Sequence, residues 1–226
     1  MKQVETLILQ FNTKLKQREI SLFRGAVIAK LAKNNILYHN HIDDGFRYNY
    51  PLVQYKILDG KTSIVYVGIE GANAASDFMS ANDLNLQIGT QLKIFQFLNI
   101  KTDKINLGIA ESSNTYFIKH WLPFNAKNFT SYKKSKSIVD TAQLLEKILL
   151  GNILSFLKSQ LVFVEEKIQV NITDIIKVNN IKFKDIHLLC MDVLFCCNVF
   201  LPSYIGLGKH SSIGYGTLFR KNDIKK

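Results

Sequence analysis

Ile205 to Phe219, near the end of the chain, reads IGLGKHSSIGYGTLF and carries four glycines in two pairs. Glycine permits backbone conformations and close approaches that a Cβ forbids. The stretch therefore lets the backbone press either against a phosphate chain beside Lys209 or against its own sheet in a tight turn. The four glycines are Gly206, Gly208, Gly214 and Gly216.

Two common nucleotide-binding glycine motifs do not fit this stretch. A P-loop reads G-x-x-x-x-G-K-[ST], but its first glycine would fall on Ser203, and His210 follows the lysine. The dinucleotide fingerprint G-x-G-x-x-G would need a glycine at Ser211 and a βαβ unit around it. Both nucleotide-binding classes are therefore excluded.

The chain is long enough for one large domain or two small ones, and it is strongly basic. Its 226 residues carry a formal net charge of +11, and most of the excess lies in residues 114–226. A basic half attracts polyanions, so nucleic acid is the leading candidate partner. A general bias of the source towards lysine, asparagine and isoleucine is the alternative explanation.

Cysteine usage and hydropathy indicate the compartment. All three cysteines lie in one apolar run, which favours reduced, buried thiols over a metal site. Glu5 interrupts the region where a signal peptide would have its apolar core. The longest apolar stretch, residues 188–201, is too short to cross a bilayer. We expect a cytoplasmic protein with no membrane contact.

Hydrophobic patterning in the first half predicts the order β–α–β–β–α–β, which is the ferredoxin-like pattern. Ser21 is the expected N-cap of the first helix, and Asp59-Gly60 is a strong hairpin signal. The expected strands are Val4–Phe11, Leu52–Leu58, Ser63–Ile69, Thr90–Leu98 and Lys104–Ala110, and the second helix is Gly71–Leu86.

The second half again mixes one major helix, Ile138–Leu161, with a sheet. A polar, basic loop at 125–136, which contains Lys133 and Lys134, precedes that helix. The expected strands are Tyr116–Pro123, Phe163–Ile176, Ile181–Phe183, Ile186–Phe200 and Thr217–Arg220. We predict an α+β fold with two tandem ferredoxin-like (βαββαβ-type) domains, 1–113 and 114–226, the second irregular with a C-terminal glycine-rich loop.

Two histidines one residue apart, His39 and His41, are the best candidates for chemistry. Histidine exchanges protons near neutral pH, so two in one loop can supply a general base and a general acid. Metal binding together with Asp43 and Asp44 is a second interpretation, and a loop pair with no role is a third. Residue types alone leave all three open.

The glycine pattern resembles that of the CRISPR repeat-RNA-processing endoribonucleases, which belong to the repeat-associated RNA-binding superfamily. Their motif reads G-hydrophobic-G, five residues, then G-aromatic-G near the C-terminus, and residues 206–216 fit every position. A second similarity is to the W-L-x-h-N-x2-N-x3-Y segment of an I-B-like subgroup. Here that segment is Trp121-Leu122-Pro123-Phe124-Asn125 with Asn128 and Tyr132.

The resemblance implies cleavage of the repeat transcript without metal or cofactor, leaving a 2′,3′-cyclic phosphate and a 5′-hydroxyl. It also implies an active site of Lys30, His39, His41 and Tyr48, with Tyr50 as a substitute for Tyr48. His41 would be the base and His39 the acid or positioning group. Lys30 would stabilise charge, and Tyr48 would orient the phosphate.

The resemblance further implies that the glycine stretch and the basic second half bind the RNA backbone. The expected RNA-binding residues are Gly206, Gly208, Lys209, His210, Gly214, Gly216, Lys133 and Lys134. CRISPR repeat RNA is the implied partner, and effector-complex subunits and a second copy of the chain are further candidates. A non-catalytic RNA-binding subunit of such a complex is the rival interpretation.

Overall fold

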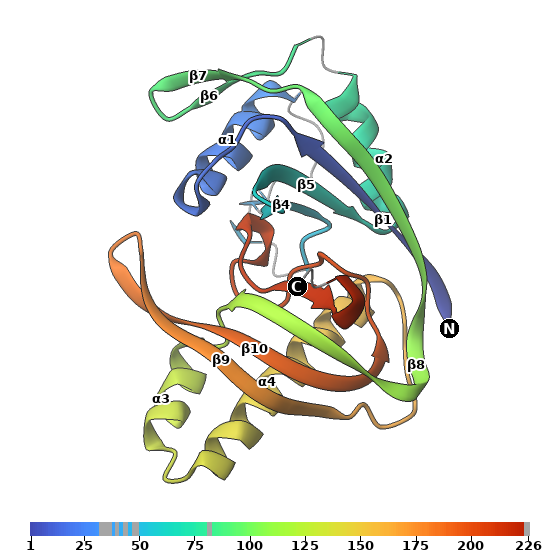
Figure 1. The fold of residues 1–226 in the computed structure, drawn as a ribbon, viewed down its shortest axis with the longest axis vertical. Coiled ribbons are helices and arrows are strands. Elements are labelled where there is room, and N and C mark those ends of the chain that lie inside the picture. The colour runs from blue at the N-terminus through green and yellow to red at the C-terminus, as the bar shows by residue number, and fades with distance from the viewer. Residues whose placement is uncertain (32–37, 39–40, 43–44, 47–49, 81–82, 224–226) are drawn as a thin grey trace. The chain divides into compact units, whose positions relative to one another are not determined.

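The chain forms two compact units, seen in a computed structural model that describes all residues except 32–37, 39–40, 43–44, 47–49, 81–82 and 224–226 (Figure 1). Residues 41–42 and 45–46 are described by their backbone alone. The N-terminal unit comprises Val4–Lys104 with Ser212–Gly214, and the C-terminal unit comprises Met1–Gln3, Ile105–Ser211 and Tyr215–Lys226. No helix of the described residues is long and apolar enough to span a membrane.

The N-terminal unit has the strand order of a ferredoxin-like sheet, β4-β5-β1-β8. The elements follow the predicted order along the chain. They are β1 (Lys2–Phe11), α1 (Ile20–Lys30), β4 (Val53–Leu58), β5 (Lys61–Val67), α2 (Gly68–Met79) and the start of β8 (Phe97–Trp121). Two short hairpins are added, β2 (His41–Ile42) with β3 (Gly45–Phe46) and β6 (Asn85–Ile88) with β7 (Gln91–Ile94).

Both helices of this unit cover one face of its sheet (Figure 1). Phe11 on β1 meets Phe23 of α1 and Phe78 of α2 edge to face, with ring centroids 5.9 and 6.0 Å apart. Tyr55 on β4 also packs against Phe23. This aromatic cluster forms the core between helices and sheet.

The predicted hairpin is present, and its turn explains why. Asp59 and Gly60 both adopt positive φ, 50° and 71°, which two-residue turns of the I′ type require. Other boundaries differ from the expectation. α1 begins at Ile20 after Glu19, so Ser21 is not its N-cap. α2 ends at Met79, and the β6–β7 hairpin was not predicted.

β8 is a single strand of 25 residues where two shorter strands and a boundary were expected. Residues 111–113 are exposed in the middle of this strand, so their polar side chains resemble those of a loop. The compact units divide β8 between residues 104 and 105. The predicted division between residues 113 and 114 also falls within β8 and stays a prediction.

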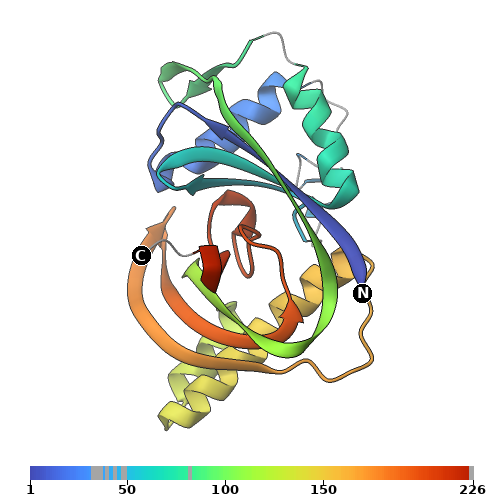
Figure 2. The same cartoon turned by 45° about the vertical axis from the view of Figure 1, so that its right-hand side comes forward.

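The C-terminal unit repeats the same strand order, β9-β10-β8-β11. α3 (Ala126–Lys134) and α4 (Ile138–Ser159) follow β8, and then come β9 (Val170–Phe183), β10 (Ile186–Phe200) and β11 (Thr217–Arg220). α4 lies against the curved β9–β10 pair, with α3 beside its first half (Figure 2). In place of the second helix stands the glycine-rich stretch, with one 3-10 turn at Ser211–Ile213. The predicted fold class is therefore confirmed, including the irregular second domain.

α3 occupies most of the segment that was predicted to be a loop. Asn125 caps its N-terminus, because the side-chain oxygen accepts a hydrogen bond of 2.8 Å from the backbone N–H of Asn128. Tyr132 packs on Phe124 with ring centroids 4.7 Å apart. The segment with the spaced asparagines and tyrosine thus forms a helix.

The sheet face of the N-terminal unit that points away from its helices carries buried polar side chains. Lys56 lies on it, because side chains alternate along a strand and neighbouring Tyr55 faces α1. Ser63 pairs with both Lys56 and Gln10, so the three form one row across the sheet. The Lys56 side chain is fully buried, and this desolvation lowers the pKa of Lys56 to about 7.

Replacing Lys56 by methionine will change how stability depends on pH. Between pH 7 and pH 10 the unfolded lysine holds a proton that the folded lysine has lost, so wild-type stability rises with pH through this range. The free energy of unfolding of wild type, relative to that of Lys56→Met, should therefore increase from pH 7 to pH 9.5. Urea denaturation at both pH values checks this. A stability difference that is the same at both would contradict the burial of this amine.

Candidate nucleic-acid interface and active site

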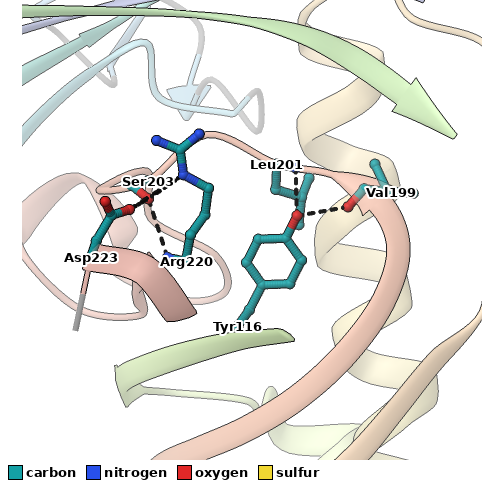
Figure 3. A network of polar contacts seen from close by, with 6 residues as sticks. All are labelled: Tyr116, Val199, Leu201, Ser203, Arg220 and Asp223. Atoms are coloured by element: carbon teal, nitrogen blue, oxygen red, sulfur yellow. Dashed lines mark hydrogen bonds and ion pairs between the residues drawn. The ribbon is translucent and has the colours of Figure 1, made fainter. Parts of the chain in front are cut away.

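The chain entering the glycine-rich stretch is fixed to β8 by a buried tyrosine. Tyr116 Oη donates a hydrogen bond of 2.9 Å to the carbonyl of Val199 and accepts one of 2.9 Å from the N–H of Leu201 (Figure 3). Burial raises the pKa of Tyr116 to about 12, so the phenol stays protonated. The end of β10 is thus held where the chain leaves the sheet.

A second polar cluster joins the entry of the stretch to its exit. Ser203 Oγ accepts hydrogen bonds from the backbone N–H and Nε of Arg220, at 3.2 and 3.1 Å. It donates to the carboxylate of Asp223, which also pairs with Arg220 Nε at 3.3 Å (Figure 3). Residues before and after the glycines are therefore tied together.

Between these anchors the backbone is folded back on itself. Leu207 N–H donates to the carbonyl of Gly216 over 2.8 Å, and Gly216 N–H donates to the carbonyl of His120 over 2.9 Å. Gly216 has φ +62°, and a Cβ there would overlap the carbonyl oxygen of Leu207. Only glycine allows this approach, so the interpretation as a tight turn within a sheet is correct for the backbone.

An irregularity at the end of β8 positions the carbonyl of His120, which accepts the hydrogen bond from the N–H of Gly216. His120 has φ +53°, and the register between β8 and β10 shifts between Met191 and Val193. Asp192 stabilises the irregularity, because its carboxylate accepts a hydrogen bond of 2.6 Å from the N–H of His120. Burial lowers the pKa of His120, which matches a packed residue that shapes the backbone.

Gly208, in the first glycine pair, packs on Trp121, the only tryptophan of the sequence. A Cβ at Gly208 would lie 2.7 Å from Trp121 Nε1. Trp121 is fully buried, and its Nε1 donates a hydrogen bond of 3.0 Å to Asn152 Oδ1 on α4. The two sequence similarities therefore meet in space, because the tryptophan of one segment supports a glycine of the other.

Only part of the glycine-rich stretch faces solvent. Lys209 is exposed, Gly208 and His210 are half-buried, and Gly206, Gly214 and Gly216 are buried. The N–H of Lys209 donates a hydrogen bond of 3.2 Å to the carbonyl of Leu122, which fixes the backbone of this exposed residue. RNA binding by the eight expected residues stays a prediction, and the residues between Gly206 and Gly216 that are available for direct contact are 208–210 and Tyr215.

The two predicted lysines of α3 lie in a different part of the C-terminal unit. Lys133 and Lys134 are in the last turn of α3, towards the end of the unit farthest from the glycine-rich stretch (Figure 1). Lys133 Nζ lies 4.6 Å from the centroid of the Phe129 ring, a cation–π contact. The structure therefore does not bring these lysines together with the glycine-rich stretch.

His210 packs against the aromatic rings of Phe183 and Tyr215 in the C-terminal unit. Its ring stacks on that of Phe183, with centroids 4.2 Å apart and an interplanar angle of 25°. Burial and, to a smaller extent, the positive charges of Lys209 and Lys184 together lower the pKa of His210 to about 4. His210 is therefore neutral at physiological pH and offers an aromatic surface and no positive charge.

The predicted catalytic residues belong to the N-terminal unit. Lys30 ends α1, and its ammonium forms an ion pair of 2.6 Å with Asp83. His41 lies in β2, paired with Phe46 of β3, and its side chain is not described. His39 and Tyr48 lie outside the described residues, as do Asp43 and Asp44 of the metal interpretation. The four catalytic assignments stay predictions.

The chain next to these histidines is anchored. Tyr38, directly before His39, is buried and donates a hydrogen bond of 2.7 Å from Oη to the carbonyl of Ala74 on α2. Tyr50, the substitute for Tyr48, accepts a hydrogen bond of 2.9 Å from Gln54 Nε2. Anchors on both sides fix where the candidate loop starts and ends.

Sequence reasoning did not identify Asp83 as the partner of Lys30. The ion pair and a hydrogen bond of 2.9 Å from the N–H of Asn85 lower the pKa of Asp83. Asp83 precedes a hairpin that was not predicted, and 53 residues separate it from Lys30. No local pattern links the two, so only the fold could reveal the pair.

Solved structures are similar to this chain in fold. One, described as a crystal structure of Cas6b, has a TM-score of 0.87 and 30% identity, covering 97% of this chain and all of that one. Another, described as CRISPR RNA processing endoribonuclease Cas6b, has a TM-score of 0.74 and 28% identity with the same coverage. An uncharacterised protein of Methanocaldococcus jannaschii is 31% identical over 143 residues, which is 63% of this chain and 95% of the relative.

Family models match almost the whole chain. The Cas6b N-terminal domain matches residues 2–106, and the Cas6b C-terminal domain matches residues 108–221. The chain belongs to the Cas6b family. The resemblance to the CRISPR repeat-RNA-processing endoribonucleases, first seen in the glycine spacing, is confirmed at the level of the family.

Replacing Gly216 by alanine should destabilise the C-terminal unit, whereas replacing Gly151 by alanine should not. Gly216→Ala forces a Cβ into the Leu207 carbonyl at positive φ and should lower the free energy of unfolding by at least about 2 kcal/mol. Gly151, in α4, has nothing within 4 Å of an added Cβ, so Gly151→Ala should stabilise by up to about 1 kcal/mol. Urea denaturation measures both, and equal stabilities would contradict the described backbone.

Proposed function

We propose that this chain is an endoribonuclease that cleaves CRISPR repeat RNA (pre-crRNA) into mature guide units. Membership of the Cas6b family carries the proposal. A structural relative that covers 97% of the chain is described as a CRISPR RNA processing endoribonuclease. The formal net charge of +11 suits a polyanionic substrate. Association with effector-complex subunits or with a second copy of the chain stays a prediction.

The proposed chemistry uses the RNA's own 2′-hydroxyl and no metal. His41 takes the 2′-hydroxyl proton, the 2′-oxygen attacks the adjacent phosphorus, and the bond from phosphorus to the 5′-oxygen breaks. His39 donates a proton to that leaving oxygen. The products are a 2′,3′-cyclic phosphate and a 5′-hydroxyl. Two imidazoles are suited to this exchange, because one must be neutral and the other protonated near pH 7.

Lys30 and Tyr48 act on the phosphate in this mechanism. The negative charge that builds up on the phosphorane needs a nearby cation, which is the role proposed for Lys30. The ion pair of Lys30 with Asp83 is partly exposed, and such pairs contribute little to stability. A phosphate group can therefore replace Asp83 as the partner of Lys30, and until then Asp83 keeps the lysine side chain beside the end of α1.

A single deoxynucleotide should block cleavage, and a chelator should not. RNA carrying the CRISPR repeat of the source genome is incubated with the protein in EDTA, and products are resolved on a denaturing gel. We expect full cleavage of the all-ribose RNA and none when the scissile nucleotide is 2′-deoxy, because the nucleophile is then missing. Cleavage of the deoxy substrate would contradict attack by the 2′-hydroxyl, and a requirement for added Mg²⁺ would contradict metal-free cleavage.

Removal of both loop histidines should abolish cleavage and leave RNA binding in place. His39→Ala/His41→Ala should cut at least about 10³ times more slowly, since the proton acceptor and donor are both lost. His187→Ala is the matched control, because His187 is exposed on β10 and takes no part in the mechanism. Single-turnover rates and gel shifts of the same samples measure the two properties.

Two outcomes would count against this assignment. Wild-type rates in the double variant would contradict the choice of residues. Wild-type protein that shifts repeat RNA but yields no product would favour the non-catalytic RNA-binding subunit.

A further inference from the structure

Three partly exposed rings meet where the tip of the β9–β10 hairpin reaches the glycine-rich stretch. Phe183, the last residue of β9, stacks on His210 with centroids 4.2 Å apart and contacts Tyr215 edge to face at 6.2 Å. His210 and Tyr215 are themselves 6.3 Å apart. All three belong to the C-terminal unit and keep part of their surface in solvent.

The backbone holds these rings in place without any ligand. β9 and β10 stay paired up to Phe183 and Ile186 at the hairpin end, and Lys184 turns the chain with φ +54°. His210 has φ +57°, a conformation that most side chains avoid. The glycine-rich stretch carrying His210 and Tyr215 is fixed through Leu122 and His120. The rings therefore form a preorganised surface, which avoids much of the cost of ordering on binding.

Positive charge flanks this aromatic group on both chain segments. Lys184 follows Phe183, Lys209 precedes His210, and both lysines are exposed. Both lie close enough to His210 to lower its pKa, although burial is the larger cause. The ring of His210 is neutral at pH 7, so it provides a stacking surface between two cations.

We propose that Phe183, His210 and Tyr215 form a platform on which an unpaired base of the substrate RNA stacks, with Lys184 and Lys209 binding the phosphates beside it. This rests on the proposed function and adds a base-stacking site outside the proposed catalytic residues. Aromatic side chains bind splayed, single-stranded bases, because bases inside a duplex are covered by their neighbours. The platform is thus a site for a single-stranded nucleotide of the repeat.

A scan of the RNA against variants of the platform tests this. The probe is repeat RNA with a 2′-deoxy scissile nucleotide, which binds without being cut, and with a single abasic site at each position in turn. Affinities are measured for wild type, Phe183→Leu and His210→Asn. Asparagine tolerates the positive φ of residue 210 better than most residues, and leucine keeps an apolar side chain at residue 183. Phe163→Leu is the control, because Phe163 is 82% exposed and outside the platform.

The stacked base should appear as one position of the scan. Its removal should weaken binding by wild type and by Phe163→Leu about tenfold to a hundredfold. The same removal should change binding by Phe183→Leu and His210→Asn less than about threefold, because the stacking contribution is already lost. If Phe183 and His210 only help to pack the loop, the two variants would bind every RNA of the scan more weakly by the same factor. The dependence of binding on the abasic position would then be the same as in wild type, which would contradict the proposal.

Failure of this inference differs from failure of the proposed function. If wild type cleaves all-ribose repeat RNA but the platform variants keep the wild-type abasic profile, the platform is wrong and the endoribonuclease assignment stands. If wild type neither binds nor cleaves repeat RNA, both the proposed function and the stacking platform are wrong.

Discussion

The C-terminal unit depends on a backbone contact that only glycine permits, between Gly216 and the carbonyl of Leu207. This contact lets the chain double back beside the end of β8 and pair Gly206 with Thr217. The strand order of a ferredoxin-like sheet is thereby completed by β11, although its second helix is missing. Three groups support the contact: the Asp192 carboxylate beneath His120, the Trp121 indole beneath Gly208, and the Ser203–Arg220–Asp223 cluster at the ends.

Because most of the glycines are buried, only a few side chains of the glycine-rich stretch are accessible to a ligand. The buried glycines shape the stretch, and a ligand would contact the exposed Lys209 and the half-buried His210 and Tyr215. His210 is kept neutral by burial, so charge and aromatic surface are supplied by different side chains. The bond-breaking groups that we propose lie in the N-terminal unit, where Tyr38 anchors the chain directly before His39. Each unit thus has its own part in the proposed reaction.

Local signals in the sequence predicted much of the fold, and non-local contacts account for most of what was missed. Asp59-Gly60 specified its hairpin because turn chemistry depends on the turn residues alone. α3 has no buried residue to give a periodic pattern, so its segment was predicted to be a loop, and the capping residue Asn125 was the one local signal of a helix that could have been used. The exposed middle of β8 looked like a loop for the same reason. Lys30 was predicted from family spacing, but its partner Asp83 and the stacking of His210 on Phe183 join distant segments that no local pattern connects.

Residue-resolved amide hydrogen exchange, in free protein and with bound repeat RNA, tests the central claim that the glycine-rich stretch is a folded part of the core before RNA arrives. The amides of Leu207, Gly216 and Leu218 donate to carbonyls within the chain. They should exchange in the free protein as slowly as the amides of β10, and RNA should add little protection. Fast exchange of Leu207 and Gly216 in the free protein, with slow exchange only after RNA binds, would contradict the account.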